Sequence, residues 1–186
     1  VDYSHYGFTV NQQDPSIDFS QDDLTGLIIS GETFRNLSIN GKDFSGSVFK
    51  NTIFEDMNIT NSKFLGVQFY NATFKNSNII NSDFSGSAID ASDFIGGDLE
   101  NSKFQNVRGD TVSFKESSLH NTDFSYFTME AISFINVDLR TSNFDHSSIQ
   151  QSKFINSNLN GLLIYDSELR DISFENSDVV KLKTDN

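Results

Sequence analysis

Three residues with acid–base side chains stand twenty positions apart in this chain: Glu100, His120 and Arg140. A carboxylate, an imidazole and a guanidinium held in one column could relay a proton, as general acid–base catalysis requires. The other histidines, His5 and His146, are scattered and form no cluster with this triplet. The same spacing is typical of a surface ladder in which each ion pair contributes about 0–1 kcal/mol. The ladder is the interpretation that we adopt.

A second set with the same spacing is purely acidic: Asp90, Asp110 and Glu130. If residues twenty apart are neighbours in space, three like charges lie next to one another, which destabilises a sheet. No structural need for them is visible in the sequence, so they are candidates for contact with a basic surface or a cation. The alternative is an exposed corner at which salt screens the repulsion.

The elements that position these side chains follow from a period of five. Stepping by five from Phe19 to Val179 gives 33 positions, of which 17 are Phe, 15 are Ile, Leu, Met or Val, and one is Gly109. This period fits neither an α-helix nor a plain β-strand. It predicts a short extended stretch followed by a corner, repeated without insertion.

The residues around each large apolar position support that geometry. The position two before it is Ser in 14 of the 33 units, as at Ser82 and Ser92, and a small side chain suits an inward corner. The position two after it is mostly Asn or Gly, as at Gly86 and Asn101. These two residue types tolerate turn and left-handed backbone conformations.

Four sides per coil explain the alternation of residue types. With four sides, residues twenty apart stack, and like falls on like. One wall would then be Phe34, Phe54, Phe74, Phe94, Phe114, Phe134, Phe154 and Phe174. The opposite wall would run from Phe44 to Phe144 in the same steps and end on Ile164, and a third would be lined by Ile and Leu. Matched aromatic columns pack well, which favours the square over a triangle.

The units "NSDFS" and "GGDLE" resemble the pentapeptide-repeat family, whose repeat is small-[Asp/Asn]-[Leu/Phe]-x-x. The resemblance covers residues 17–180 and implies a right-handed quadrilateral parallel β-helix of about eight coils. Residues 1–16 are expected to be an N-terminal cap and residues 181–186 a C-terminal tail. Known members of the family include DNA-mimicking proteins that bind type II topoisomerases and repeat domains of secreted bacterial effectors.

Composition excludes several classes of function. The formal charge of −13 and the pI near 4.4 argue against direct nucleic-acid binding, which needs clustered Lys and Arg. The chain has no Cys, hence no disulfide and no thiolate metal site, and no apolar run long enough to span a membrane. A straight rod without loop insertions predicts no concave site. We therefore expect no enzyme, no cofactor and no metal.

Two further surface features are predicted. Ile95, Ile135 and Ile155 share an outward column that Lys115 interrupts, which makes it a candidate apolar contact with a partner. The broken repeat position, Gly109, stands in the tripeptide Arg-Gly-Asp that is associated with adhesion. Because this Gly should face the core, compensated packing by Phe127, one coil later, is the better interpretation.

The sequence thus predicts a non-enzymatic protein-binding or scaffold module, which could be the repeat domain of a larger secreted bacterial effector. The alternative is a DNA-mimicking inhibitor or protector of a type II topoisomerase such as gyrase. The partner is unknown, a basic surface on it is favoured by the charge, and both the bacterial cytoplasm and secretion stay open. The last coil is exposed, paired with a second molecule, or continued by a further domain.

Overall fold

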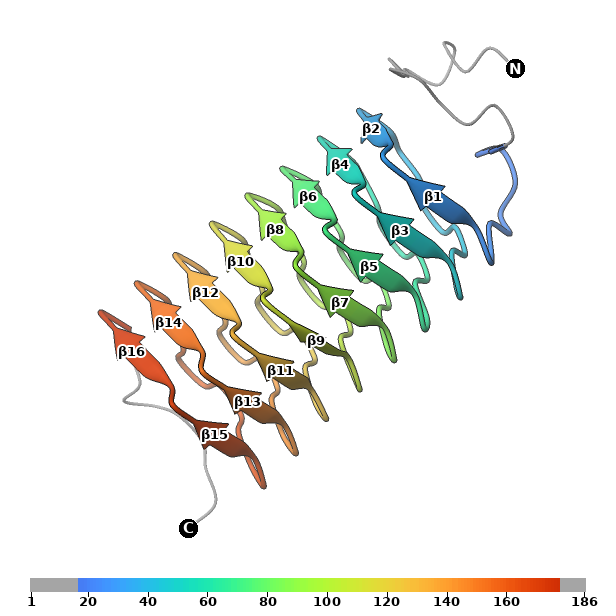
Figure 1. Ribbon diagram of the computed structural model, residues 1–186. Helices are drawn as coiled ribbons and strands as arrows, with labels where there is room; N and C mark the ends of the chain where they lie inside the picture. Colours follow the sequence, from blue (N-terminus) through green and yellow to red (C-terminus); the bar gives the residue numbers. More distant parts are fainter. Residues whose placement is uncertain (1–16, 178–186) are drawn as a thin grey trace.

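The computed structural model of the protein describes residues 17–177 of the 186-residue chain. Three-residue strands alternate along the chain between two parallel sheets of eight strands each (Figure 1). The odd sheet contains β1 (Ile28–Ser30), β3 (Val48–Lys50), β5 (Gln68–Tyr70), β7 (Ala88–Asp90), β9 (Arg108–Asp110), β11 (Thr128–Glu130), β13 (Ser148–Gln150) and β15 (Glu168–Arg170). The even sheet contains β2 (Thr33–Arg35), β4 (Ile53–Glu55), β6 (Thr73–Lys75), β8 (Asp93–Ile95), β10 (Ser113–Lys115), β12 (Ser133–Ile135), β14 (Lys153–Ile155) and β16 (Ser173–Glu175).

The coil has four sides. The odd and even sheets form two of them, and the other two are held by single parallel bridges such as Asp43↔Lys63 and Ser118↔Asp138. Every register partner stands twenty residues away, as Phe94 does from Phe114. Seven full turns separate β1 from β15, and the predicted right-handed quadrilateral parallel β-helix is confirmed. Among residues 17–177, no helix is long and apolar enough to cross a membrane.

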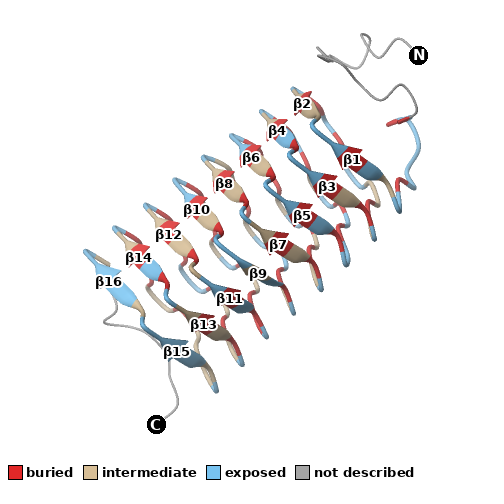
Figure 2. Ribbon diagram, viewed as in Figure 1, coloured by how far each residue is buried: buried red, intermediate tan, exposed pale blue. Residues whose placement is uncertain are grey.

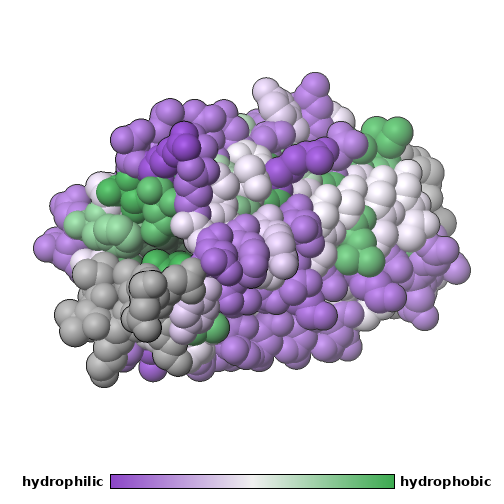
Figure 3. Space-filling view, turned by 90° about the horizontal axis from the view of Figure 1, so that it is seen from below, coloured by the Kyte–Doolittle hydropathy of each residue, from purple (hydrophilic) through white to green (hydrophobic). Residues whose placement is uncertain are grey.

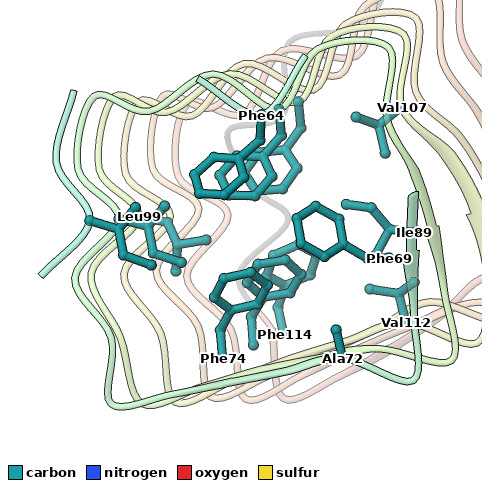
Figure 4. Close-up of a cluster of buried hydrophobic side chains, with 14 of the residues drawn as sticks. Phe64, Phe69, Ala72, Phe74, Ile89, Leu99, Val107, Val112 and Phe114 are labelled. Carbon is teal, nitrogen blue, oxygen red and sulfur yellow. The ribbon is translucent and has the colours of Figure 1, made fainter. Parts of the chain in front are cut away.

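The core is built of stacked rings. The two predicted Phe walls face each other across the interior, with ring centroids of consecutive coils 4.5–5.6 Å apart (Figure 4). Rings of opposite walls meet edge to face, as Phe84 and Phe94 do at 6.3 Å. Figure 2 shows the buried centre of each strand flanked by more exposed residues, except in β9, whose centre is half-buried, and in the last coil, where β15 and β16 are exposed. The inward and outward assignments are therefore confirmed over most of the rod.

The buried corner serines hold one coil to the next. Ser82 Oγ accepts a hydrogen bond from the Ser62 amide at 3.2 Å and donates one to the Ile59 carbonyl at 2.9 Å. Ser102 repeats both bonds one coil later. The small size of these residues was predicted from the sequence, but their hydrogen bonds to the backbone were not. Because a buried amide without a partner costs stability, these hydroxyls are structural.

Each corner also contains a residue whose backbone has the left-handed conformation. Every fifth residue from Gly26 to Asn176 has a positive φ, whatever its type. Asn and Gly fill most of these positions at little cost, and Asn121 also donates a side-chain hydrogen bond to Asn101 at 2.7 Å. Thr111 and Thr141 are the β-branched exceptions, at 56° and 57°. Side chains of that shape are strained in this conformation.

Thr141→Asn is therefore expected to raise the free energy of unfolding by about 1 kcal/mol. Asn visits the left-handed region readily, and the new side chain would extend the Asn column that includes Asn121. The reverse change one coil earlier, Asn121→Thr, is the matched control and should lower stability by a similar amount. Urea denaturation followed by circular dichroism measures both. Two variants as stable as the wild type would show that corner strain does not limit this fold.

A second prediction concerns Asp93, on the outer face of β8 between its register partners Thr73 and Ser113. Burial raises the pKa of its carboxyl above the ordinary value of 3.8. The folded state then holds this proton more tightly than the unfolded state, so stability falls as pH rises through the two pKa values. Asp93→Asn should thus be slightly more stable than the wild type at neutral pH, and the difference should vanish below pH 3.8. Paired thermal melts across this range test it, and a less stable variant at neutral pH would contradict it.

The outer surface is mostly hydrophilic, with small hydrophobic areas (Figure 3). Basic residues interrupt the acidic surface on each of the four sides. Examples, one from each side, are Arg108, Lys115, Arg140 and Lys103. One outward column, which we call the alternating column, consists of Asp43, Lys63, Asp83, Lys103, Asp123 and Asn143. In it Lys63 Nζ lies 3.9 Å from Asp43 Oδ2, and Lys103 Nζ lies 4.0 Å from Asp83 Oδ2. The predicted cap at 1–16 and tail at 181–186 lie outside the described residues.

Candidate functional site

The Glu100, His120 and Arg140 triplet forms two separate pairs on the surface. His120 Nδ1 lies 2.8 Å from Glu100 Oε1, whereas Arg140 Nη2 lies 2.6 Å from Asp138 Oδ2. Burial raises the pKa of the Asp138 carboxyl, but the hydrogen bonds from Arg140 outweigh it, so that this pKa lies below its ordinary value. Arg140 is thus engaged by Asp138, and the surface ladder predicted from the sequence describes these residues better than a relay.

Metal-binding groups are also accounted for in the described part of the chain. Within residues 17–177, no three His, Cys, Asp or Glu side chains lie close enough together to hold a metal ion. The contact between His146 Nε2 and Asp166 Oδ2 at 3.5 Å, for example, brings two such groups together.

The acidic column lies at the ends of three neighbouring strands of the odd sheet. Asp90 ends β7, Asp110 ends β9 and Glu130 ends β11, and the last two are direct register partners. Asp90 Oδ1 accepts a hydrogen bond from the Asp110 amide at 3.1 Å. These acids were expected to have no structural role, and the structure differs on this point. The Asp90 carboxylate accepts the hydrogen bond that a backbone carbonyl of β7 would accept from the Asp110 amide in a regular ladder.

The ladder is broken because Gly109 lacks a side chain. Strands β7 and β9 pair only through Ala88↔Arg108, whereas β9 and β11 pair over all three residues. A Cβ placed on Gly109 would lie 1.8 Å from the Ile89 carbonyl oxygen, a distance that no real side chain tolerates. The Gly backbone therefore approaches β7 more closely than any other residue could. The Arg-Gly-Asp tripeptide lies in a strand, not in a protruding loop.

Phe127 was expected to compensate for the missing side chain of Gly109. Phe127, one coil later, is fully buried, with its ring 5.1 Å from that of Phe124 and 6.0 Å from that of Phe144. Phe127 is thus buried in the core, and its filling of the space beside Gly109 stays a prediction. Gly109 itself is only half-buried, while Ile89 and Met129 in the same column are buried.

On the outside, the displaced strand leaves a concavity that the sequence did not predict. The Gly109 hollow has a volume of about 310 Å³ and is lined by Asp90, Arg108, Gly109, Asp110, Met129 and Glu130, among others. A straight rod was expected to have no concave site, and that expectation is wrong at this point. The volume suffices for one long side chain, at the lower end of the range for ligand sites.

A second hollow on the same face was also missed. It has a volume of about 370 Å³ and is lined by Val48, Lys50, Gln68, Phe69, Tyr70, Ala88 and Asp90. Tyr70 is 53% exposed, and Lys50 Nζ lies 5.8 Å from the centre of its ring. The only signal in the sequence was an aromatic residue at an outward position, which the repeat pattern neither requires nor explains. We call this the Tyr70 hollow.

The predicted apolar column lies on the other sheet. Ile95, Ile135 and Ile155 end β8, β12 and β14, with Lys115 between the first two, and all three Ile are half-buried. The column is thus confirmed as a column, but the structure does not bring it together with the acidic residues. The two sets occupy different sheets on either side of a corner.

Comparison with known proteins adds the following findings. Residues 110–183 match a family model described as "Pentapeptide repeat region", and residues 68–106 match one described as "Pentapeptide repeats (8 copies)". The two matches together cover more than half of the chain. No curated protein matches the chain by sequence.

One solved structure shares the fold over most of this chain, and a second shows a weaker likeness. QnrB1, described as a plasmid-mediated fluoroquinolone resistance protein, is 17% identical over 88% of this chain and 94% of its own, with a TM-score of 0.53. HetL, a pentapeptide repeat protein involved in heterocyst differentiation regulation from the cyanobacterium Nostoc sp. strain PCC 7120, is 10% identical over 87% and 91%, with a TM-score of 0.42. At these identities the likeness concerns the fold alone.

Proposed function

This chain belongs to the pentapeptide-repeat family, and from that premise we propose that it is a non-enzymatic protein-binding module. Its contact surface is the outer face of the odd sheet around Gly109. One observation carries the proposal: the single break in the repeat coincides with a hollow and with the acidic column. At this position the backbone of β9 lies against the Ile89 carbonyl, and the outer surface beside it is hollow and acidic.

The chemistry of the described surface supports a binding role over a catalytic one. The buried corner Ser side chains are hydrogen-bonded to the backbone of the preceding coil, as Ser82 is, and are not available as nucleophiles. His120 is half-buried and paired with Glu100, outside both hollows of the odd sheet. What the Gly109 hollow offers is a shape and three carboxylates.

The test is affinity capture with three immobilised proteins. We expect wild type and the control Asp43→Asn/Asp83→Asn/Asp123→Asn to retain the same partner. The variant Asp90→Asn/Asp110→Asn/Glu130→Gln is expected to lose it at least tenfold. Both triple variants remove three charges, and Asn keeps the oxygen that accepts the turn amides of Ser45 and Ser125. Equal recovery on all three would exclude this face as the contact.

A DNA-mimicking inhibitor of gyrase is the second candidate. The formal charge of −13 on a rod favours it. Against it stands the distribution of the charge, because Lys or Arg residues interrupt the acidic residues on all four sides. A supercoiling assay with purified gyrase decides: inhibition or protection at micromolar protein would establish this reading, and no effect would remove it.

A further inference from the structure

The Gly109 hollow and the Tyr70 hollow adjoin on the outer face of the odd sheet, since Ala88 and Asp90 line both. Together they extend from β3 to β13, which is six strands. At the inter-strand spacing of ~4.8 Å, this groove is roughly 24 Å long and runs along the rod axis. An extended polypeptide of about seven residues has that length.

The two ends of the groove differ in chemistry. At the Tyr70 end, an exposed aromatic ring and Val48 offer apolar contact, and Lys50 supplies a positive charge. The Gly109 end is lined by three carboxylates and by one guanidinium, that of Arg108. The first end suits an apolar side chain, whereas the second, with its three carboxylates, attracts cations.

We propose that the groove binds an extended polypeptide segment of a partner, with an apolar side chain against Tyr70 and a Lys or Arg side chain in the Gly109 hollow. Tyr70 on β5 and Asp110 on β9 are two strand spacings apart, or ~10 Å, which an extended chain covers in about three residues. The basic residue therefore stands three or four positions from the apolar one. This inference rests on the proposed function and specifies its partner.

The geometry favours a peptide over a nucleic acid or a second rod. Phosphates would face the three carboxylates of the acidic column, and such like-charge contact is unfavourable. The groove runs across strands that are three residues long, so this face is narrow and suits one extended chain better than a sheet. Lys50 and the acidic column at opposite ends give the bound segment a defined orientation.

The test is selection of random linear dodecapeptides displayed on phage against the immobilised full chain. We expect enrichment of peptides with an apolar residue three or four positions from Lys or Arg. Asp90→Asn/Asp110→Asn/Glu130→Gln should reduce recovery of these peptides at least tenfold, and Tyr70→Ser should remove the apolar preference while keeping the basic one. The control Asp43→Asn/Asp83→Asn/Asp123→Asn should behave as wild type.

The possible outcomes distinguish the peptide inference from the proposed function. Enriched peptides that lack this pattern, or that bind the acidic-column variant equally well, overturn the peptide inference. If affinity capture still depends on the acidic column in that case, the proposed function stands without it. If neither experiment depends on this face, both are overturned. Circular dichroism of every variant confirms that the fold is intact before binding is compared.

Discussion

Replacing Phe94 by Ala is expected to lower the free energy of unfolding by about 3–5 kcal/mol. Phe94 is 1% exposed, and its ring lies 4.8 Å from that of Phe74 and 4.7 Å from that of Phe114. It also meets the edges of Phe84 and Phe104 at 6.3 and 5.8 Å. The backbone of each coil is hydrogen-bonded to the coils on both sides, so the column cannot collapse into the space left by the ring. The full cost of the cavity is therefore retained.

Denaturant unfolding followed by circular dichroism measures this loss. Asp93→Asn is the matched control, because it alters the adjacent residue of the same strand on the opposite face. A loss below about 1 kcal/mol for Phe94→Ala would mean that the coils can close around a missing ring. If Asp93→Asn were the more damaging change, the inward and outward faces would have been assigned the wrong way round.

The second large effect is expected at the small corner. Ser92→Leu should lower the free energy of unfolding by about 2–4 kcal/mol, through overpacking and loss of a hydrogen-bond acceptor. Ser92 is fully buried, accepts a hydrogen bond from the Ala72 amide at 3.0 Å, and donates one to the Asp90 carbonyl at 2.8 Å. Leu supplies neither bond and adds volume at the corner between the Phe wall that contains Phe94 and the side of the coil that contains Ile89.

Two further variants separate the causes. Ser92→Ala removes only the hydroxyl and should cost about 1–3 kcal/mol, because the buried Ala72 amide loses its partner. Ser92→Val adds volume that the same corner accepts one coil later, where Val112 is buried. Thermal melts of the three proteins give the order. A neutral Ser92→Ala would show that the hydroxyl contributes nothing, and overpacking would then have to explain the whole loss.

These hydrogen bonds also bear on the proposed groove. Each coil is fixed to its neighbours by backbone ladders and by corner hydroxyls, so the outer rows of side chains hold constant spacing. A surface that is rigid before binding loses little conformational freedom when a partner docks. The groove can thus be shallow and still distinguish the order of residues in a bound segment.

The candidate site was predictable only in part. The acidic column and the isoleucine column follow from the spacing of twenty, since a period of five on four sides fixes which residues are stacked. The Gly109 break was visible as the one position without a large side chain. Its consequence was not, because a missing side chain can leave a core cavity, draw in a neighbour or displace the strand. The Tyr70 hollow gave no signal beyond one exposed aromatic residue.

The sequence by itself determined the period, the four sides, the two Phe walls and the left-handed corners. Each of these depends on which way a side chain points, and in a repeating coil that is a matter of position along the chain. Only the tertiary structure decided that β9 approaches the Ile89 carbonyl, that Asp90 takes over a backbone hydrogen bond, and that two hollows adjoin on one face. These features arise from contacts between successive coils, where a backbone shift at one Gly changes which partners its neighbours find, and no residue pattern encodes the direction of that shift.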